Sequence, residues 1–227
     1  MPSVLITGAS RGLGLELARQ YAMNEWAVYA ACRDPANASA LGKIAPQDSI
    51  TVLQIDVTDP ASIAQAARAV SGPIDVLINN AGIMGGNPSF GRMDYQDWEA
   101  VLRVNTLAPL RVTEAFAAHL ERGNRRLIVT ITSGLASISE NTSGGWLAYR
   151  SSKAAVNMVM HSVAVALASR RITCVLVSPG WVQTDMGGPS ATLTPAESVA
   201  ALRRLFERLG PSDSGKVFSH DGREVAW

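Results

Sequence analysis

The sequence predicts an α/β fold in which one doubly wound parallel sheet of about seven strands is covered by helices on both faces. Three observations indicate this fold. Short β-branched runs alternate with Ala- and Leu-rich helical stretches along all 227 residues. Several runs are apolar at consecutive positions, as in parallel strands that are buried on both sides. No linker-like change of composition, internal repeat or low-complexity tract interrupts the chain, so we expect residues 1–227 to form a single domain.

Seven expected strands and five expected helices alternate along the chain, with no helix expected between the second and third strands. The β-branched or apolar runs are the expected strands: Val4–Thr7, Ala27–Cys32, Thr51–Ile55, Val76–Ile78, Leu127–Thr132, Thr173–Val177 and Val217–Ser219. The stretches between them are the expected helices: Gly12–Asn24, Pro60–Val70, Tyr95–Leu120, Trp146–Ser169 and Pro195–Leu209. The last helix begins with an N-cap and a proline in its first turn, Thr194-Pro195, and ends at Gly210-Pro211.

Composition and charge limit the classes of function. The formal net charge of +1 gives no electrostatic case for a nucleic-acid or membrane-surface partner. Cys32 and Cys174 lie in apolar runs, where buried, reduced thiols are expected rather than a disulfide framework. The most apolar late run, Val156–Ala168, is shorter than the roughly 20 residues that span a bilayer, and no signal peptide is recognisable. We therefore expect a cytoplasmic protein without a membrane partner, and the motifs call for no metal.

A glycine-rich turn joins the first strand to the first helix: Thr7-Gly8-Ala9-Ser10-Arg11-Gly12-Leu13-Gly14. Gly8 can adopt backbone angles that a Cβ would forbid, and Gly12 lets the main chain approach a pyrophosphate at the positive end of the helix. Gly14 permits close packing of the helix on the strand. The spacing is Gly-x3-Gly-x-Gly rather than the common Gly-x-Gly-x2-Gly, and it predicts a dinucleotide site formed by Gly8 and Ser10–Gly14.

The same turn also matches Gly-x-Ser-x-Gly, the nucleophile elbow of α/β-hydrolases, with Ser10 as the nucleophile. An elbow serine needs an oxyanion hole from an earlier loop, and an acid and a histidine further along the chain. Here the motif follows the first strand, and of the three histidines only His220 comes late enough. The hydrolase is the weaker alternative.

The end of the second strand bears on cofactor choice. In dinucleotide folds an acid at this position binds the ribose 2′-hydroxyl, whereas a basic residue accommodates a 2′-phosphate. Arg33 is placed to accommodate a 2′-phosphate. Arg11 of the glycine turn is expected to reach the same phosphate with a second guanidinium. Asp34 leaves the other possibility open, because a shift of one residue would turn it toward the ribose. NADP(H) is favoured and NAD(H) remains possible.

Tyr149 and Lys153 are four residues apart on a predicted helix and therefore share one face. A phenol titrates near pH ~10, and we expect the nearby ammonium to lower the pKa of Tyr149. Tyr149 could then protonate a carbonyl oxygen as hydride arrives, or deprotonate an alcohol in the reverse direction. Ser133, at the end of the fifth strand, could hydrogen-bond the same oxygen. A tyrosine and a lysine at this spacing are common on helix surfaces, so the pair gains weight only from its companions.

Those companions are Asn79-Asn80-Ala81-Gly82 after the fourth strand and Asn105 in the long helix. Together with the glycine turn, Ser133 and Tyr149-x3-Lys153, they make the whole chain resemble the short-chain dehydrogenase/reductase family. Within the family, the chain is most similar to the compact C-factor and sniffer-type carbonyl reductases, because it has a short C-terminal segment that ends in Asp221–Trp227. The resemblance implies a Rossmann-like NAD(P)-binding oxidoreductase that acts on a small carbonyl or alcohol substrate.

The resemblance also implies roles for individual residues. Lys153 would hold the nicotinamide ribose as well, and Asn105 would anchor a water in a proton relay from Lys153 to solvent. Val182 and Thr184 would hold the nicotinamide carboxamide. The remaining cofactor positions that it implies are Asp56 and Val57 at the adenine, Asn80, Ala81 and Gly82 at the ribose side, and Pro179 and Gly180. For Asn79 and Asn80, stabilisation of the turn is the alternative role.

Two features depart from the family pattern. Ser133 and Tyr149 are 16 positions apart, about three more than is usual, and we expect the extra residues within Ile138–Gly145, beside the substrate pocket. The segment Asp185–Thr194 is short and rich in Gly and Ser, which favours a shallow, open pocket.

Two further expectations concern assembly and an alternative function. The helix Trp146–Ser169 carries many small residues, and in the family such helices commonly form the interface of a homodimer or homotetramer. The alternative function is a sensor or signalling protein that binds NAD(P) without turnover. The complete Asn105–Ser133–Tyr149–Lys153 set argues against it, because a protein that only binds the cofactor needs no tuned phenol.

Overall fold

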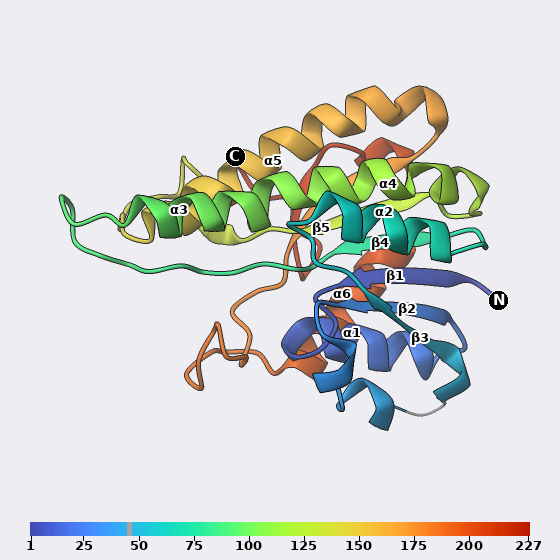
Figure 1. Cartoon of the computed structure of the whole chain (residues 1–227). Coiled ribbons are helices and arrows are strands. Elements are labelled where there is room, and N and C mark those ends of the chain that lie inside the picture. Colours follow the sequence, from blue (N-terminus) through green and yellow to red (C-terminus); the bar gives the residue numbers. More distant parts are fainter. Residues whose placement is uncertain (45–46) are drawn as a thin grey trace.

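The computed structural model describes residues 1–44 and 47–227, and this part of the chain forms one seven-stranded parallel sheet between two layers of helices (Figure 1). The strands are β1 (Ser3–Thr7), β2 (Ala27–Cys32), β3 (Ile50–Gln54), β4 (Val76–Asn79), β5 (Leu127–Ile131), β6 (Thr173–Ser178) and β7 (Val217–Ser219). The α-helices are α1 (Gly12–Ala22), α2 (Pro60–Ala69), α3 (Tyr95–Leu102), α4 (Ala108–Arg122), α5 (Leu147–Leu167) and α6 (Pro195–Arg208). The predicted fold class is confirmed.

The strand order is β3-β2-β1-β4-β5-β6-β7, and neighbouring strands pair in parallel. The chain therefore winds outward from β1 to β3 and then crosses back to β4 on the other side of β1. Doubly wound sheets bind their ligands at such a reversal, outside the carboxyl ends of the strands. The glycine turn after β1 and the loop after β4 both begin at this point.

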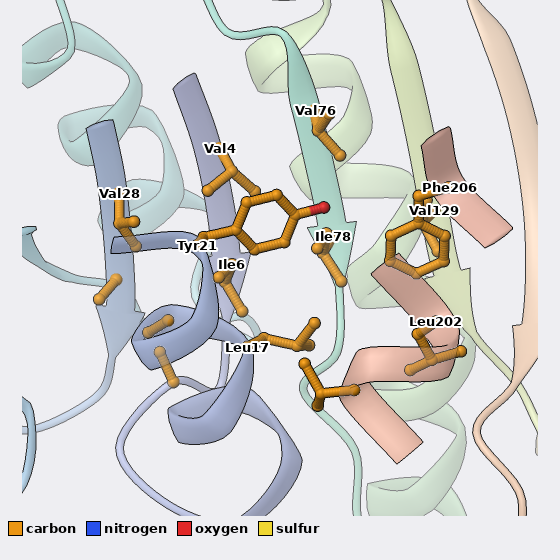
Figure 2. Close-up of a cluster of buried hydrophobic side chains, with 14 of the residues drawn as sticks. Val4, Ile6, Leu17, Tyr21, Val28, Val76, Ile78, Val129, Leu202 and Phe206 are labelled. Atoms are coloured by element: carbon orange, nitrogen blue, oxygen red, sulfur yellow. The ribbon is translucent and has the colours of Figure 1, made fainter. Parts of the chain in front are cut away.

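The sheet has an apolar core on each face, and residues alternate between the two along β1. Val4 and Ile6 belong to the core under α1 and α6, whereas Leu5 belongs to the core under α2, α4 and α5. Figure 2 shows the first of these cores, with labelled side chains from the sheet, from α1 and from α6: Val4, Ile6, Val28, Val76, Ile78, Val129, Leu17, Tyr21, Leu202 and Phe206. This packing holds the carboxyl edge of the sheet, where the candidate site lies, as a rigid platform.

The prediction of one continuous helix over Tyr95–Leu120 is wrong in its middle. A π-helical segment, Arg103–Leu107, separates α3 from α4. Pro109 lies in the first turn of α4 and has no N–H to offer the carbonyl of Asn105, four residues earlier, so the regular α-helical ladder is broken there. The segment turns Asn105 and Thr106 into the protein, where they are 1% and 5% exposed.

The two thiols are as expected. Cys32 and Cys174 are buried and form no disulfide with each other or with any other described residue. Burial raises the pKa of the Cys174 thiol to about 12, so it stays protonated at neutral pH. Within residues 1–44 and 47–227, no helix combines the length and the apolar character needed to cross a membrane.

Candidate active site

The first two turns of α5 bring Tyr149 and Lys153 to one buried face at the carboxyl end of β5. Their side chains are 7% and 5% exposed. The Lys153 Nζ lies 5.8 Å from the centroid of the Tyr149 ring and donates a hydrogen bond of 2.8 Å to the main-chain carbonyl of Ile131, the last residue of β5. Ser133 follows two residues after the strand. The structure therefore brings these three predicted residues together.

Burial raises the pKa of Tyr149, and a hydrogen bond with the Ser133 side chain opposes this in part. Burial also lowers the pKa of Lys153 to about 8. The expectation that the ammonium lowers the pKa of Tyr149 is therefore wrong for the protein without its ligands. The physical reason is that both side chains are buried, and removal from water disfavours the charged form of each, the phenolate of Tyr149 and the ammonium of Lys153.

The Ser133 hydroxyl is oriented by its own turn. Its Oγ accepts a hydrogen bond of 3.1 Å from the main-chain N–H of Leu135, which leaves the Ser133 proton free to point elsewhere. With the Tyr149 phenol beside it, the site can present two O–H donors to one oxygen atom. Two such donors suit an oxygen on which negative charge develops.

The Asn105 side chain ties the loop after β4 to α5. Its Nδ2 donates to the Ile83 carbonyl at 2.8 Å and to the Ser152 Oγ at 3.0 Å, and its Oδ1 accepts from the Ile83 N–H at 2.9 Å. Both amide protons are thus used within the protein. The π-helical segment is what turns this side chain inward.

Ser152 has a larger part in the site than the sequence indicated. It is fully buried, donates to the Tyr149 carbonyl at 2.7 Å and accepts from Asn105, while its own carbonyl accepts from the Thr106 hydroxyl at 2.9 Å. Sequence reasoning missed this role, because a serine between Tyr149 and Lys153 carries no signal of its partners. Ser152 connects the π-helical segment to the turn that carries both Tyr149 and Lys153.

The glycine turn has a backbone geometry that would suit an anion. Gly8 and Gly12 have φ values of +67° and +53°, in the left-handed region that favours glycine, and a Cβ on Gly14 would lie 2.3 Å from the Gly8 carbonyl oxygen. No side chain of the described residues caps the amino end of α1 at Arg11, so its first amides are open to a phosphate. The Asn80 Nδ2 donates to the carbonyls of Thr7 and Gly8 at 2.8 Å and 3.2 Å, which supports its turn-stabilising role.

At the end of β2, the two residues that are candidates for contact with the cofactor ribose, Arg33 and Asp34, differ in their partners. The Asp34 carboxylate accepts hydrogen bonds from the main chain and side chain of Asn37, and so caps the short 3₁₀ turn Pro35–Asn37. Arg33 is exposed, and its guanidinium forms no ion pair with any described residue. The Arg11 guanidinium pairs with Asp185 at 2.7 Å, and both side chains are largely exposed.

The segment after β6 lies against the glycine turn. A Cβ on Gly12 would stand 3.4 Å from the Thr184 Cγ2, and the Thr184 Oγ1 accepts from the Gly187 N–H at 3.2 Å. Gly180 has a φ of +82° and follows Pro179, whose carbonyl accepts from Ser198 at 2.7 Å. Of the predicted positions Pro179 to Thr184, Thr184 thus lies against the turn after β1.

The remaining predicted positions lie along the same edge. Hydrogen bonds from Thr58 to Asp56, of 2.8 Å from its N–H and 2.7 Å from its hydroxyl, hold the pKa of that carboxyl below its usual range. Val57 is 8% exposed. A Cβ on Gly82 would lie 3.3 Å from the Asn105 Oδ1 and 3.7 Å from the Lys153 Nζ, so the loop after β4 passes directly over the buried lysine.

Comparisons with known proteins agree with this geometry. The family model described as short chain dehydrogenase matches residues 2–193. C-signal of Myxococcus xanthus is 45% identical over 164 residues, which are 72% of this chain and 99% of that protein. The carbonyl reductase Sniffer of D. melanogaster superposes with a TM-score of 0.94 at 32% identity, over 100% of both chains. The NADPH-bound carbonyl reductase from chicken fatty liver gives a TM-score of 0.92 at 35% identity, over 100% of this chain and 99% of that one.

Lys153→Met should change how stability depends on pH. Because burial lowers the pKa of Lys153 to about 8, the unfolded chain binds this proton between about pH 8 and pH 10.5 and the folded chain does not. The wild type therefore gains stability relative to the variant as the pH rises, by roughly 2–3 kcal/mol between pH 7 and pH 10. Urea denaturation at both pH values measures this, with exposed Lys43→Met as the control. A difference between Lys153→Met and wild type that is the same at both pH values would contradict the burial of the ammonium.

Proposed function

We propose that this chain, which belongs to the short-chain dehydrogenase family, transfers a hydride between NADP(H) and the carbonyl or alcohol carbon of a small substrate, with Tyr149 as the acid/base. That the chain is an oxidoreductase of this family follows from the comparisons. The observation that supports the finer proposal is the pair of adjacent hydroxyls, Tyr149 and Ser133, beside a buried lysine at the carboxyl edge of the sheet.

In the reductive direction the residues have distinct tasks. NADPH, when bound, supplies the hydride that the carbonyl carbon gains. Tyr149 gives its phenolic proton to the carbonyl oxygen, and Ser133 donates a hydrogen bond to that oxygen while charge develops on it. When Lys153 carries its proton, its positive charge would oppose the effect of burial and favour the phenolate that Tyr149 becomes. In the oxidative direction Tyr149 accepts the proton of the alcohol.

The preference for NADP(H) over NAD(H) rests on Arg33 and Asp34. The Asp34 carboxylate is engaged by Asn37, whereas the Arg33 guanidinium is open to a 2′-phosphate. The chicken carbonyl reductase that resembles this chain holds NADPH. Arg11 would join Arg33 only by leaving Asp185. A cellular NADP pool that is kept reduced would favour reduction, and the proposal includes a cytoplasmic location.

The roles that the family resemblance implies remain part of the proposal. Lys153 would hold the nicotinamide ribose, Asn105 would anchor a relay water, and Val182 and Thr184 would hold the carboxamide. Because the side-chain amide of Asn105 is used within the protein, its main-chain carbonyl is the group that we assign to the water. The whole of residues 1–227 would serve as one cofactor-binding domain.

We also propose that the protein is a homo-oligomer. The outer face of α5 exposes Met158 and Val165 by 64% and 69%, although the opposite face of this helix is packed on the sheet. Exposed apolar side chains on one helix face are typical of an interface. Light scattering during gel filtration should give the mass of a dimer or tetramer, and Val165→Asp should shift it toward that of the monomer. A monomeric wild type would exclude this part of the proposal.

Tyr149→Phe should remove turnover without removing cofactor binding. A general acid contributes a rate factor of roughly 10² to 10⁴, so NADPH oxidation with aldehydes, ketones, quinones and α-dicarbonyls should fall at least 100-fold. Tyr95→Phe, at an exposed tyrosine of α3, is the matched control and should keep wild-type rates. Tight NADPH binding without turnover by the wild type across this panel would instead favour a protein that only binds its cofactor.

Arg33→Ala should weaken the binding of NADPH but not that of NADH. Loss of charge-assisted hydrogen bonds to a phosphate should raise the NADPH dissociation constant by about tenfold or more. Titration of intrinsic fluorescence with each cofactor measures both constants, and Arg68→Ala, at an exposed arginine of α2, serves as the control. Unchanged affinity of Arg33→Ala for both cofactors would show that the 2′-phosphate is bound elsewhere.

A further inference from the structure

The Arg150 side chain holds the segment between Ser133 and Tyr149 against the start of α5. Its Nη1 donates to the Leu135 carbonyl at 3.3 Å, and its Nη2 donates to the Ser143 hydroxyl at 2.9 Å. Leu135 precedes the segment 138–145, within which the extra residues are expected, and Ser143 lies near the end of that segment. One guanidinium, on the residue that follows Tyr149, therefore closes this segment into a loop.

The first of these bonds leads directly to the substrate-binding hydroxyl of the proposed function. Leu135 accepts from Arg150 through its carbonyl and donates through its N–H to the Ser133 Oγ at 3.1 Å. Arg150 is thus connected to Ser133 through one residue and to Tyr149 through the peptide bond. Because both hydroxyls must meet the same oxygen, a change in this connection changes their relative position.

Two other contacts hold the far end and the middle of the segment. Gly144, Gly145 and Trp146 all have left-handed φ values, of 62°, 69° and 49°, and the Asn87 Oδ1 accepts from the Trp146 N–H at 2.6 Å. The main-chain oxygen of Trp227 accepts from the N–H of Ser139 at 3.2 Å and from its hydroxyl at 3.0 Å. The segment is therefore fixed at several points, and Arg150 is the side chain that joins its two ends.

The chemistry of arginine suits this task. A guanidinium presents a rigid planar fork of donors, so it can reach two acceptors at once, which the single ammonium of a lysine does less well. The Arg150 Nε is buried and has no hydrogen-bond partner among the described residues. A buried donor without a partner costs stability. The two hydrogen bonds that the Nη1 and Nη2 of Arg150 donate explain why an arginine stands here despite this cost.

We propose that Arg150 is a positioning residue for the reaction described above: through Leu135 and Ser143 it sets the spacing of the Ser133 and Tyr149 hydroxyls and the position of the pocket wall at 138–145. The inference rests on the proposed function. It assigns no contact between Arg150 and the substrate, so Arg150 acts through its neighbours.

Steady-state kinetics of Arg150→Ala, Arg150→Lys and Ser143→Ala test this proposal with a small aldehyde and a bulky ketone. A misplaced reacting group costs up to about 100-fold in rate, so kcat of Arg150→Ala should fall by roughly 10- to 100-fold with both substrates. KM should rise only for the bulky ketone, which reaches the wall. The NADPH dissociation constant should stay within about twofold of wild type, a result that general unfolding would not give.

Three comparisons sharpen the result. Arg150→Lys should recover part of kcat, and the effects of Arg150→Ala and Ser143→Ala should be non-additive, since the two side chains share one hydrogen bond. Arg204→Ala, at an exposed arginine of α6, should behave as wild type. Wild-type kcat and KM in Arg150→Ala would overturn the proposal.

Hydrogen exchange separates failure of this inference from failure of the proposed function. If the wild type turns over no carbonyl substrate, the proposed function fails, and amide exchange across 135–145 still reports on the role of Arg150. Faster exchange there in Arg150→Ala, but not in Arg204→Ala, would retain Arg150 as the residue that fixes this segment. Unchanged exchange would overturn that role as well.

Discussion

Burial of the Lys153 ammonium beside Tyr149, where β5 ends, is the constraint on which the rest of the site depends. The lysine is 5% exposed, and its Nζ donates to the carbonyl of Ile131. Removing a charge from water costs stability unless partners replace the water, and here the cost appears as a pKa lowered to about 8. α5 keeps the lysine in place because Val156 and Met160, on the same side of the helix, are packed into the core.

The polar residues around this pair hold elements in position. Asn105 and Ser152 join the π-helical segment, the loop after β4 and the first turns of α5, so three elements fix the face that carries Tyr149. Asn80 does the same for the glycine turn. The reversal of the sheet between β1 and β4 then places the glycine turn and the hydroxyl pair along one edge.

Much of this arrangement could be predicted from the sequence, because it depends on local pattern. Consecutive apolar runs indicate buried parallel strands, and a four-residue spacing puts Tyr149 and Lys153 on one face. The rest depends on tertiary contacts. A π-helical segment leaves no periodicity to recognise, so the inward turn of Asn105 was not foreseeable, nor were the partners of Ser152. The engagement of Asp34 by Asn37 depends on the turn that follows, and the directions of the pKa shifts of Lys153 and Tyr149 depend on burial.

We propose that Tyr149 and Ser133 both hydrogen-bond one substrate oxygen, which Tyr149 protonates. A crystal structure of the complex with NADP⁺ and an unreactive carbonyl analogue tests it most directly, through the distances from the carbonyl oxygen to the Tyr149 Oη and the Ser133 Oγ. We expect both distances to be about 2.5–3.0 Å, as in O–H···O hydrogen bonds. A carbonyl oxygen bound by other groups, beyond about 3.6 Å from the Tyr149 Oη, would contradict the account.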